Sequence, residues 1–228
     1  FSKKDINFFL KNSKNIFKDG FFSNHEYVKK FEKQFKKKNN SKFALATSSG
    51  TSALEIILRS FNVKNKEVLT NSNTFIATGH AIKNANAKIV PVDLEKDYYM
   101  MCPIDLKKKI NKNTGAVVIV HIGGIISPHI LKIKKICKKF GVPLIEDAAQ
   151  AHGSKFKGIP AGNLGDAGAI SFFTTKVMTT GEGGMVVTNN KKIYQNVYSL
   201  RQFGFKKNKL FHDKISGNYK LSEFSALL

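Results

Sequence analysis

The sequence lacks tryptophan, has two cysteines and has two arginines in 228 residues. Cys102 and Cys137 show no CxxC spacing, which argues against a zinc site or a disulfide framework and fits a reducing cytoplasm. No apolar run approaches the roughly 20 residues that a membrane-spanning helix needs. We therefore expect a cytoplasmic location, no membrane association and no metal.

Positive charge is abundant, with a formal net charge of +22. The lysines occupy polar positions of amphipathic segments such as "KKFEKQFKKKNN" and "KIKKICKKF". Arginine, the usual residue for base and phosphate recognition, occurs only at Arg59 and Arg201. This distribution favours solvated lysine faces, and we expect no nucleic-acid partner.

Short apolar runs alternate with helix-length segments, which predicts an α/β fold. Helices are expected over 51–61 and over 128–141, the second beginning at Pro128 and ending at Gly141. Alternation of this kind predicts a mainly parallel sheet covered on both faces, with ligands at the carboxyl ends of its strands. The seven predicted strands span residues 42–48, 67–71, 87–94, 115–122, 142–148, 167–173 and 183–189.

A possible phosphate site follows the first predicted strand, in "SSGTSALE". Gly50 and Thr51 stand at the expected start of a helix, where free N–H groups and a hydroxyl favour an anion. The alternative is a capping box of Ser52 and Glu55. After the second strand, Phe75 could stack on a planar ligand, although a single phenylalanine also suits a core.

The fifth predicted strand ends in "LIEDAAQAHG", which delivers Asp147 from an apolar segment. A partly desolvated carboxylate needs a partner. Alternative roles for Asp147 are a helix N-cap and a metal ligand. Asp147, Gln150 and His152 do not make up a metal-ligand set. His152 alone suits a structural role.

Lys176 is the single lysine in "ISFFTTKVMTTGEGGMVVTN". A desolvated lysine amine forms Schiff bases with aldehydes. Beside a phosphate site, an aromatic ring and a buried carboxylate, it indicates pyridoxal phosphate as cofactor, with the Ser171 hydroxyl as a further phosphate ligand.

The segments "SSGTSAL", "NTFIATGHAI", "PLIEDAAQAHGSKFKG", "AGNLGDAGAISFFTTKVMTTGEGGMVVTN" and "GNYKLSEF" together resemble the DegT/StrS-type sugar aminotransferases, within the aspartate-aminotransferase-like fold. The resemblance runs from about residue 20 to the end. It implies a three-layer α/β/α arrangement around a mainly parallel seven-stranded sheet, the large domain of type I pyridoxal-phosphate-dependent transferases.

The resemblance also implies roles for individual residues. It makes Lys176 the lysine that bonds to the cofactor aldehyde and shuttles a proton, Asp147 the partner of the pyridinium nitrogen, and Phe75 the stacking ring. Asn218 would reach the phosphate of a neighbouring subunit, which implies a homodimer. The remaining cofactor contacts would be the phosphate ligands Gly50, Thr51 and Ser171, and Gln150 near the phenolic oxygen.

Two residues depart from the family pattern. Thr174 stands where proline is frequent, and Lys220 stands where "GNYR" has arginine, so a bidentate contact there is lost. Family members are also longer. We expect an N-terminal segment over 1–24, a cofactor-binding large domain over 25–228, and a small C-terminal domain that is absent. Phe1 at the start and "SEFSALL" at the end suggest a fragment at both ends.

The resemblance therefore implies a pyridoxal-phosphate-dependent aminotransferase that moves an amino group from an amino acid, expected to be glutamate, to a nucleotide-linked keto sugar for amino-sugar or polysaccharide biosynthesis. Alternatives are a sugar dehydratase, in which histidine replaces the lysine, and a catalytically idle paralogue that binds cofactor or sugar. Lys176 argues against the dehydratase, and Lys176 with Asp147 disfavours the idle paralogue. The 228-residue chain alone is expected to show no measurable turnover.

Overall fold

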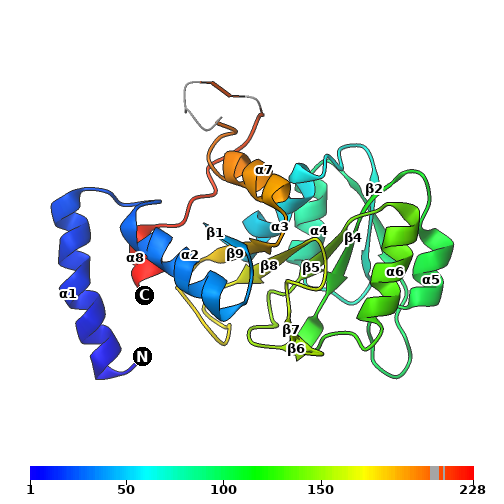
Figure 1. Cartoon of the computed structure of the whole chain (residues 1–228), viewed down its shortest axis with the longest axis horizontal. Helices are drawn as coiled ribbons and strands as arrows, with labels where there is room; N and C mark the ends of the chain where they lie inside the picture. The colour runs from blue at the N-terminus through cyan, green and yellow to red at the C-terminus, as the bar shows by residue number, and fades with distance from the viewer. Residues whose placement is uncertain (206–210, 213) are drawn as a thin grey trace.

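Seven strands form one sheet in the order β1-β9-β8-β5-β4-β2-β3 (Figure 1). The computed structural model describes residues 1–205, 211–212 and 214–228. Each neighbouring pair is parallel except the two pairs that contain β9. All seven predicted strands are confirmed, as is the mainly parallel sheet. Their bounds are β1 Phe43–Thr47, β2 Glu67–Asn71, β3 Lys88–Val92, β4 Thr114–Val120, β5 Leu144–Asp147, β8 Ala167–Ser171 and β9 Gly184–Thr188.

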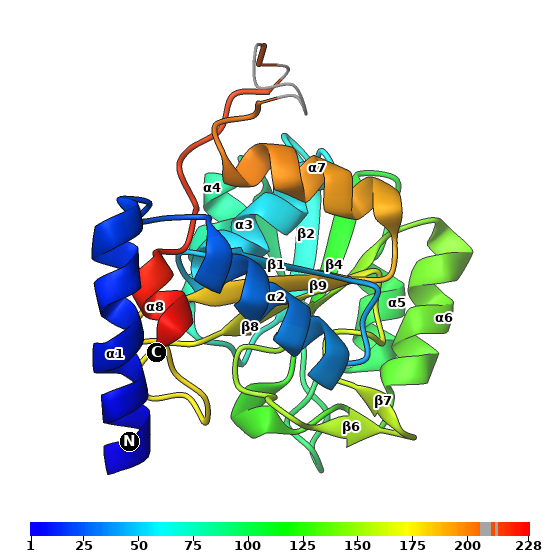
Figure 2. The ribbon, with the colours of Figure 1, turned by 60° about the vertical axis from the view of Figure 1, so that its left-hand side comes forward.

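Helices cover both faces of this sheet, which confirms the predicted three layers (Figure 2). On one face, α3 (Gly50–Ser60), α4 (Ile76–Asn84) and α7 (Lys191–Arg201) pack on residues such as Ile145 and Ala169. On the other face lie α2 (Glu26–Lys38), α5 (Pro103–Lys109) and α6 (Ile130–Phe140). Strands β4, β5, β8 and β9 are buried along their whole length, which explains their continuous apolar sequences.

Five further elements complete the described part of the chain. Helix α1 (Lys3–Asp19) lies beside α8 (Glu223–Leu227), with 5.2 Å between the ring centroids of Phe17 and Phe224 (Figure 1). The strands β6 (Lys155–Phe156) and β7 (Ile159–Pro160) form a hairpin. One 3-10 turn, Ile122–Gly124, follows β4. No helix in the described part of the chain is long and apolar enough to cross a membrane.

The predicted start of the helix at Pro128 is wrong. Helix α6 begins at Ile130, because the Ile130 N–H bonds to the Ser127 carbonyl at 3.1 Å and closes a turn in which Pro128 takes the second position. The predicted end is confirmed: Gly141 follows the helix in a left-handed conformation, with φ of 65°.

The first turn of α2 is capped by a residue almost 200 positions away. Its own N-cap residue, His25, makes no side-chain cap. Instead, the buried Glu223 carboxylate accepts hydrogen bonds from the N–H groups of His25 and Tyr27, both at 2.6 Å, and from that of Val28 at 3.2 Å. A negative charge also interacts favourably with the helix dipole at this end. Glu223 therefore joins the C-terminal segment to α2.

We expect Glu223→Gln to lower the free energy of unfolding by about 2 kcal/mol, because a buried charged acceptor with three donors is replaced by a neutral one. Urea denaturation followed by circular dichroism measures this. The matched control is Glu26→Gln, at the first residue of the same helix, where the carboxylate is exposed and pairs with exposed Lys30. Equal losses in the two variants would contradict the assigned cap.

Candidate active site

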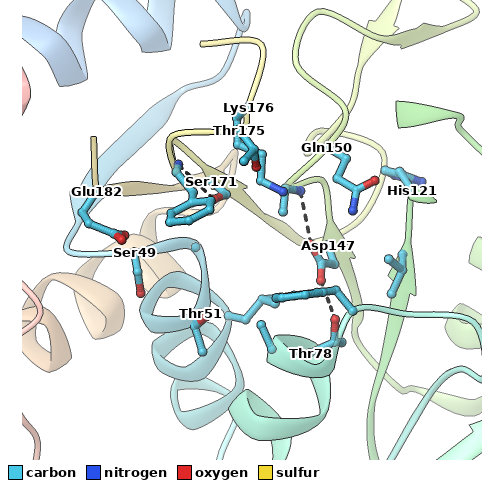
Figure 3. A pocket seen from close by; sticks show the side chains of 17 residues that line it. Ser49, Thr51, Thr78, His121, Asp147, Gln150, Ser171, Thr175, Lys176 and Glu182 are labelled. Carbon is cyan, nitrogen blue, oxygen red and sulfur yellow. Dashed lines mark hydrogen bonds between the residues drawn. The ribbon is translucent and has the colours of Figure 1, made fainter. Parts of the chain in front are cut away.

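A cavity of about 530 Å³ opens at the carboxyl ends of β2, β4, β5 and β8, as expected for this type of sheet (Figure 3). Its size suits a small organic ligand. Seven of the eight predicted site residues line it: Gly50, Thr51, Phe75, Asp147, Gln150, Ser171 and Lys176. The eighth, Asn218, does not line it and instead forms a bridge with Gln202 and accepts a hydrogen bond from the Lys220 N–H.

The start of α3 forms one wall of the cavity. Ser49 is the N-cap residue, and its hydroxyl accepts a hydrogen bond from the Ser52 N–H at 3.0 Å. The alternative capping box of Ser52 and Glu55 is therefore wrong, since Glu55 instead accepts hydrogen bonds from Arg59 and Tyr219. The first N–H groups of a helix have no partner within it, so this end of α3 can bind an anion.

Gly50 allows α3 to approach β8 closely. A Cβ atom on residue 50 would lie 2.8 Å from the Cβ of Ser171, which is too short for a carbon contact. The absence of a side chain therefore brings the helix start beside the Ser171 hydroxyl. With Thr51, these residues place two hydroxyl groups and a helix N-terminus at one side of the cavity.

Asp147 ends β5 and is 6% exposed. Its Oδ2 accepts a hydrogen bond from the Thr78 hydroxyl at 2.7 Å, and its Oδ1 accepts one from the Ala149 N–H at 3.2 Å. Burial raises the pKa of Asp147, although both hydrogen bonds and the charges of His121 and Lys176 oppose that rise. A cationic hydrogen-bond donor in the cavity would therefore be bound favourably.

The alternative interpretations of Asp147 have no support in the structure. No helix begins at Asp147, because the next helix along the chain is α7. Within the residues that the structure describes, no group of three or more His, Cys, Asp or Glu side chains could hold a metal ion. His152 does not line the cavity, and its ring lies 5.6 Å from that of Phe172. Burial lowers the pKa of His152 and thereby disfavours its protonated form.

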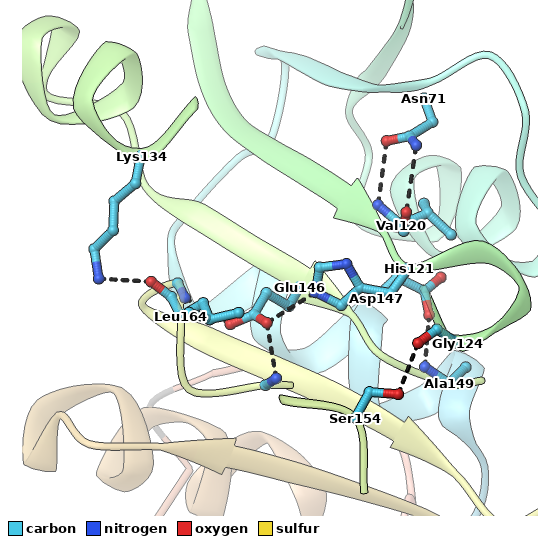
Figure 4. Close-up of polar contacts among 12 residues, drawn as sticks. Asn71, Val120, His121, Gly124, Lys134, Glu146, Asp147, Ala149, Ser154 and Leu164 are labelled. Carbon is cyan, nitrogen blue, oxygen red and sulfur yellow. Dashed lines mark hydrogen bonds and ion pairs between the residues drawn. The ribbon is translucent and has the colours of Figure 1, made fainter. Parts of the chain in front are cut away.

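Sequence reasoning missed a buried pair next to Asp147, formed by His121 and Glu146, both with 0% exposure (Figure 4). Glu146 Oε2 lies 2.9 Å from His121 Nε2 and also accepts from the Gly162 N–H, and its Oε1 accepts from the Gly165 N–H. The other ring nitrogen, Nδ1, is buried without a hydrogen-bond partner among the described residues, and His121 lines the cavity. The available signal was a histidine at the end of an apolar strand, parallel to the strand of Asp147.

Lys176 lies in the loop between β8 and β9, where its N–H bonds to the Phe173 carbonyl at 2.9 Å. It reaches the same cavity as Asp147 (Figure 3) and is close enough for its charge to lower the pKa of that carboxyl group. Phe75 precedes α4 and is 65% exposed, so its ring is not used in the core and is available to a ligand.

These residues fit pyridoxal phosphate. The start of α3 and the Thr51 and Ser171 hydroxyls suit its phosphate, the exposed Phe75 ring suits its aromatic ring, and a lysine amine suits its aldehyde. The buried Asp147 carboxylate uses two of its roughly four acceptor positions for Thr78 and Ala149, which leaves capacity for a protonated ring nitrogen.

The sheet order and its helical layers are those of the fold-type I aminotransferases. A sequence model of the DegT/DnrJ/EryC1/StrS aminotransferase family matches residues 3–228, and the chain belongs to this family.

Three relatives illustrate the match. GDP-perosamine synthase of Escherichia coli O157:H7 is 35% identical over 209 residues, which cover 90% of this chain and 57% of that protein. DesI, crystallised in the presence of its TDP-sugar product, has a TM-score of 0.90 at 29% identity, over 97% of this chain and 56% of that one. NtdA of Bacillus subtilis with bound cofactor PMP has a TM-score of 0.90 at 25% identity, over 100% of this chain and 52% of that one. The chain thus spans little more than half the length of these relatives.

The raised pKa of Asp147 has a consequence for the stability of the cofactor-free protein. At a pH above this raised pKa, Asp147 is ionised and destabilises the folded state. This loss of stability disappears as the pH falls through the raised pKa to the ordinary pKa of an aspartate. We therefore expect Asp147→Asn, which stays neutral, to raise the melting temperature at pH 8 by about 2 to 4 °C, the change produced by about 1 kcal/mol in a chain of this size. The gain should shrink as the pH is lowered.

Thermal unfolding at several pH values measures this effect. Asp166→Asn is the matched control, because Asp166 accepts a hydrogen bond from the Leu144 N–H at the other end of β5 and its loss should not stabilise the chain. A melting temperature for Asp147→Asn that falls at pH 8, as for the control, would show that burial of the Asp147 charge carries no net cost.

Proposed function

We propose that the chain is the cofactor-binding part of a pyridoxal-phosphate-dependent aminotransferase that transfers an amino group from an amino acid, expected to be glutamate, to a nucleotide-linked keto sugar. One observation carries the proposal: Lys176 and the buried Asp147 line the same cavity, beside the start of α3. The names of two relatives, GDP-perosamine synthase and DesI with its TDP-sugar product, support a nucleotide-linked sugar. NtdA with bound PMP supports the cofactor.

Each residue has a defined task in this proposal. Asp147 holds the proton on the ring nitrogen, Phe75 stacks on the ring, and Gln150 lies near the phenolic oxygen. The Gln150 Oε1 already accepts a hydrogen bond from the Gly123 N–H at 2.8 Å, so its amide N–H group is the one directed to the cofactor. The phosphate is held by Gly50, Thr51 and Ser171.

The bound cofactor supplies an aldehyde carbon that carries the amino group and a ring that withdraws electrons from the substrate carbon. Lys176 would provide the amine that holds the aldehyde in the absence of substrate. Once the substrate amine has replaced it, the free Lys176 amine would move the proton at the substrate carbon. Asp147 would face the ring nitrogen as a carboxylate, and its two donors, Thr78 and Ala149, hold it in place.

The amino donor also needs a cation for its carboxylate, and neither arginine lines the cavity. Arg201 is buried and bonds to Glu32 Oε1 at 2.6 Å and to the Ala46 carbonyl. Arg59 bonds to Glu55, Tyr219 and the Ile215 carbonyl. Of the described residues that line the cavity, Lys176 is the one lysine or arginine. This supports the proposal that further substrate contacts come from outside this cavity lining.

A second copy of the chain is the proposed source of one further cofactor contact: in a homodimer, Asn218 would reach the cofactor phosphate in the site of the neighbouring subunit. In support, Asn218 lies outside its own cavity, and its segment is tied to α3 through Tyr219, whose hydroxyl bonds to Glu55 at 2.6 Å. Residues 25–228 would form the cofactor-binding domain after an N-terminal segment over 1–24. The cytoplasm as the location stays a prediction.

Two alternatives differ in what they require of Lys176. A sugar dehydratase has histidine at the corresponding position, and Lys176 disfavours it. A catalytically idle paralogue would keep the cavity without reacting with an amino acid. Amine transfer from glutamate to the bound cofactor therefore separates the proposed aminotransferase from the idle paralogue.

We expect the chain, incubated with pyridoxal phosphate and reduced with borohydride, to carry the cofactor on the peptide that contains Lys176. Mass spectrometry of the digest locates the label, and glutamate added before reduction should diminish it. Lys176→Ala should abolish this label, whereas Lys191→Ala, at an exposed lysine of α7, should retain it. Label spread over surface lysines, equally in wild type and Lys176→Ala, would overturn the proposed cofactor site.

A further inference from the structure

Thr78 connects two residues of the candidate site that are distant in sequence. It lies in the first turn of α4 and is 1% exposed. Its hydroxyl lies 2.7 Å from Asp147 Oδ2 (Figure 3). The same hydroxyl lies 2.7 Å from the hydroxyl of Thr74. Its N–H bonds to the Phe75 carbonyl at 3.1 Å. One buried residue therefore contacts the carboxylate of Asp147 and the backbone of Phe75.

The direction of these hydrogen bonds follows from the chemistry of the groups. An ionised carboxylate only accepts, so the single hydroxyl proton of Thr78 is donated to Asp147. The Thr78 oxygen then accepts the proton of Thr74, whose other recorded partner, the Phe75 carbonyl, lies farther away at 3.3 Å. A hydroxyl that donates to a charged oxygen forms a stronger bond than one between neutral groups. This hydrogen bond therefore favours the ionised form of Asp147, in opposition to burial, which raises its pKa.

Several groups surround Asp147, and the hydrogen-bond donor that α4 contributes to them is the Thr78 hydroxyl. The charged or titratable groups facing this carboxylate are His121, at the end of β4, and Lys176, in the loop after β8. The remaining recorded donor, the Ala149 N–H, belongs to the segment that follows Asp147 itself and lies at 3.2 Å, a longer contact than that of Thr78. Loss of the Thr78 hydroxyl would leave Oδ2 without its protein donor.

The local conformation makes the position of Phe75 depend on the same residue. Phe75 is the N-cap of α4, yet its side chain provides no cap, so its backbone is held by the Thr78 N–H rather than by its own side chain. This leaves the ring free for a ligand. Two hydrogen bonds of Thr78 therefore link the Phe75 backbone to the Asp147 carboxylate.

We propose that Thr78 is a positioning residue, whose hydroxyl holds Asp147 in the orientation and charge state that a protonated ring nitrogen requires. The inference rests on the function proposed above and assigns Thr78 no direct contact with the cofactor. The hydrogen bond from Thr78 lowers the pKa of Asp147 against the larger effect of burial, which agrees with this role.

The test compares two ligands that differ only at the ring nitrogen. Pyridoxal phosphate carries this nitrogen, whereas 1-deazapyridoxal phosphate has carbon in its place. We expect Thr78→Val, which keeps the side-chain shape, to weaken binding of pyridoxal phosphate by about tenfold, the effect of losing a hydrogen bond to a charged group. Affinity for the deaza compound should change by less than about twofold, because it makes no bond to Asp147. Thr78→Ser should restore the wild-type affinity for both.

Equilibrium dissociation constants, measured by calorimetry or fluorescence on the 228-residue chain, give the readout without any turnover. Equal weakening for both ligands in Thr78→Val would overturn the inference, since it would show a general disturbance of the fold. Unchanged affinity for both would overturn it as well. If the wild-type chain binds neither ligand, the proposed function itself fails, and that outcome is distinct from a failure confined to the variant.

Discussion

Two adjacent carboxylates buried at the end of β5 impose the constraint on which the site depends. Burying a charge costs free energy unless hydrogen-bonding partners in the protein replace the lost water. Glu146 and Asp147 point to opposite faces of the sheet, as neighbours in a strand must. Glu146 contacts three nitrogen donors, two of them backbone N–H groups, and is thereby part of the protein's own framework. Asp147 has two recorded donors and a pKa raised by burial, so it retains the capacity to bind a cation.

The sheet topology determines which groups meet Asp147. Parallel pairing brings the carboxyl ends of β2, β4, β5 and β8 to one edge, and each end contributes a different function. The segment after β2 contributes Phe75, at the start of α4. The residue that follows β4 is His121, and the loop after β8 contains Lys176. Helix α3 closes the arrangement because Gly50 permits contact with Ser171. The chemistry is thus distributed over segments that are distant in sequence and converge through strand order.

The sequence alone was sufficient for the parts of this arrangement that have local signals. Seven apolar runs predicted seven strands, and polar groups after those strands predicted the cavity lining, including Asp147 and Lys176. The predicted start of α6 was wrong because proline suits both the first position of a helix and the second position of a turn, and Pro128 occupies the turn. Partners that depend on contacts across the fold were not predictable: Thr78 meets Asp147 across 69 positions, and Glu223 caps α2 from 198 positions away. His121 was missed because its partner, Glu146, is defined only by the pairing of β4 with β5.

The central claim is that the carboxyl edge of this sheet binds pyridoxal phosphate through Asp147 and Lys176. The most direct measurement is a crystal structure of the chain grown with the cofactor. The account predicts continuous density from Lys176 Nζ to the cofactor, the ring nitrogen within hydrogen-bonding distance of Asp147, and the phosphate at the start of α3 beside Ser171. Cofactor bound elsewhere, or in this cavity with its phosphate directed at Asp147, would contradict the account.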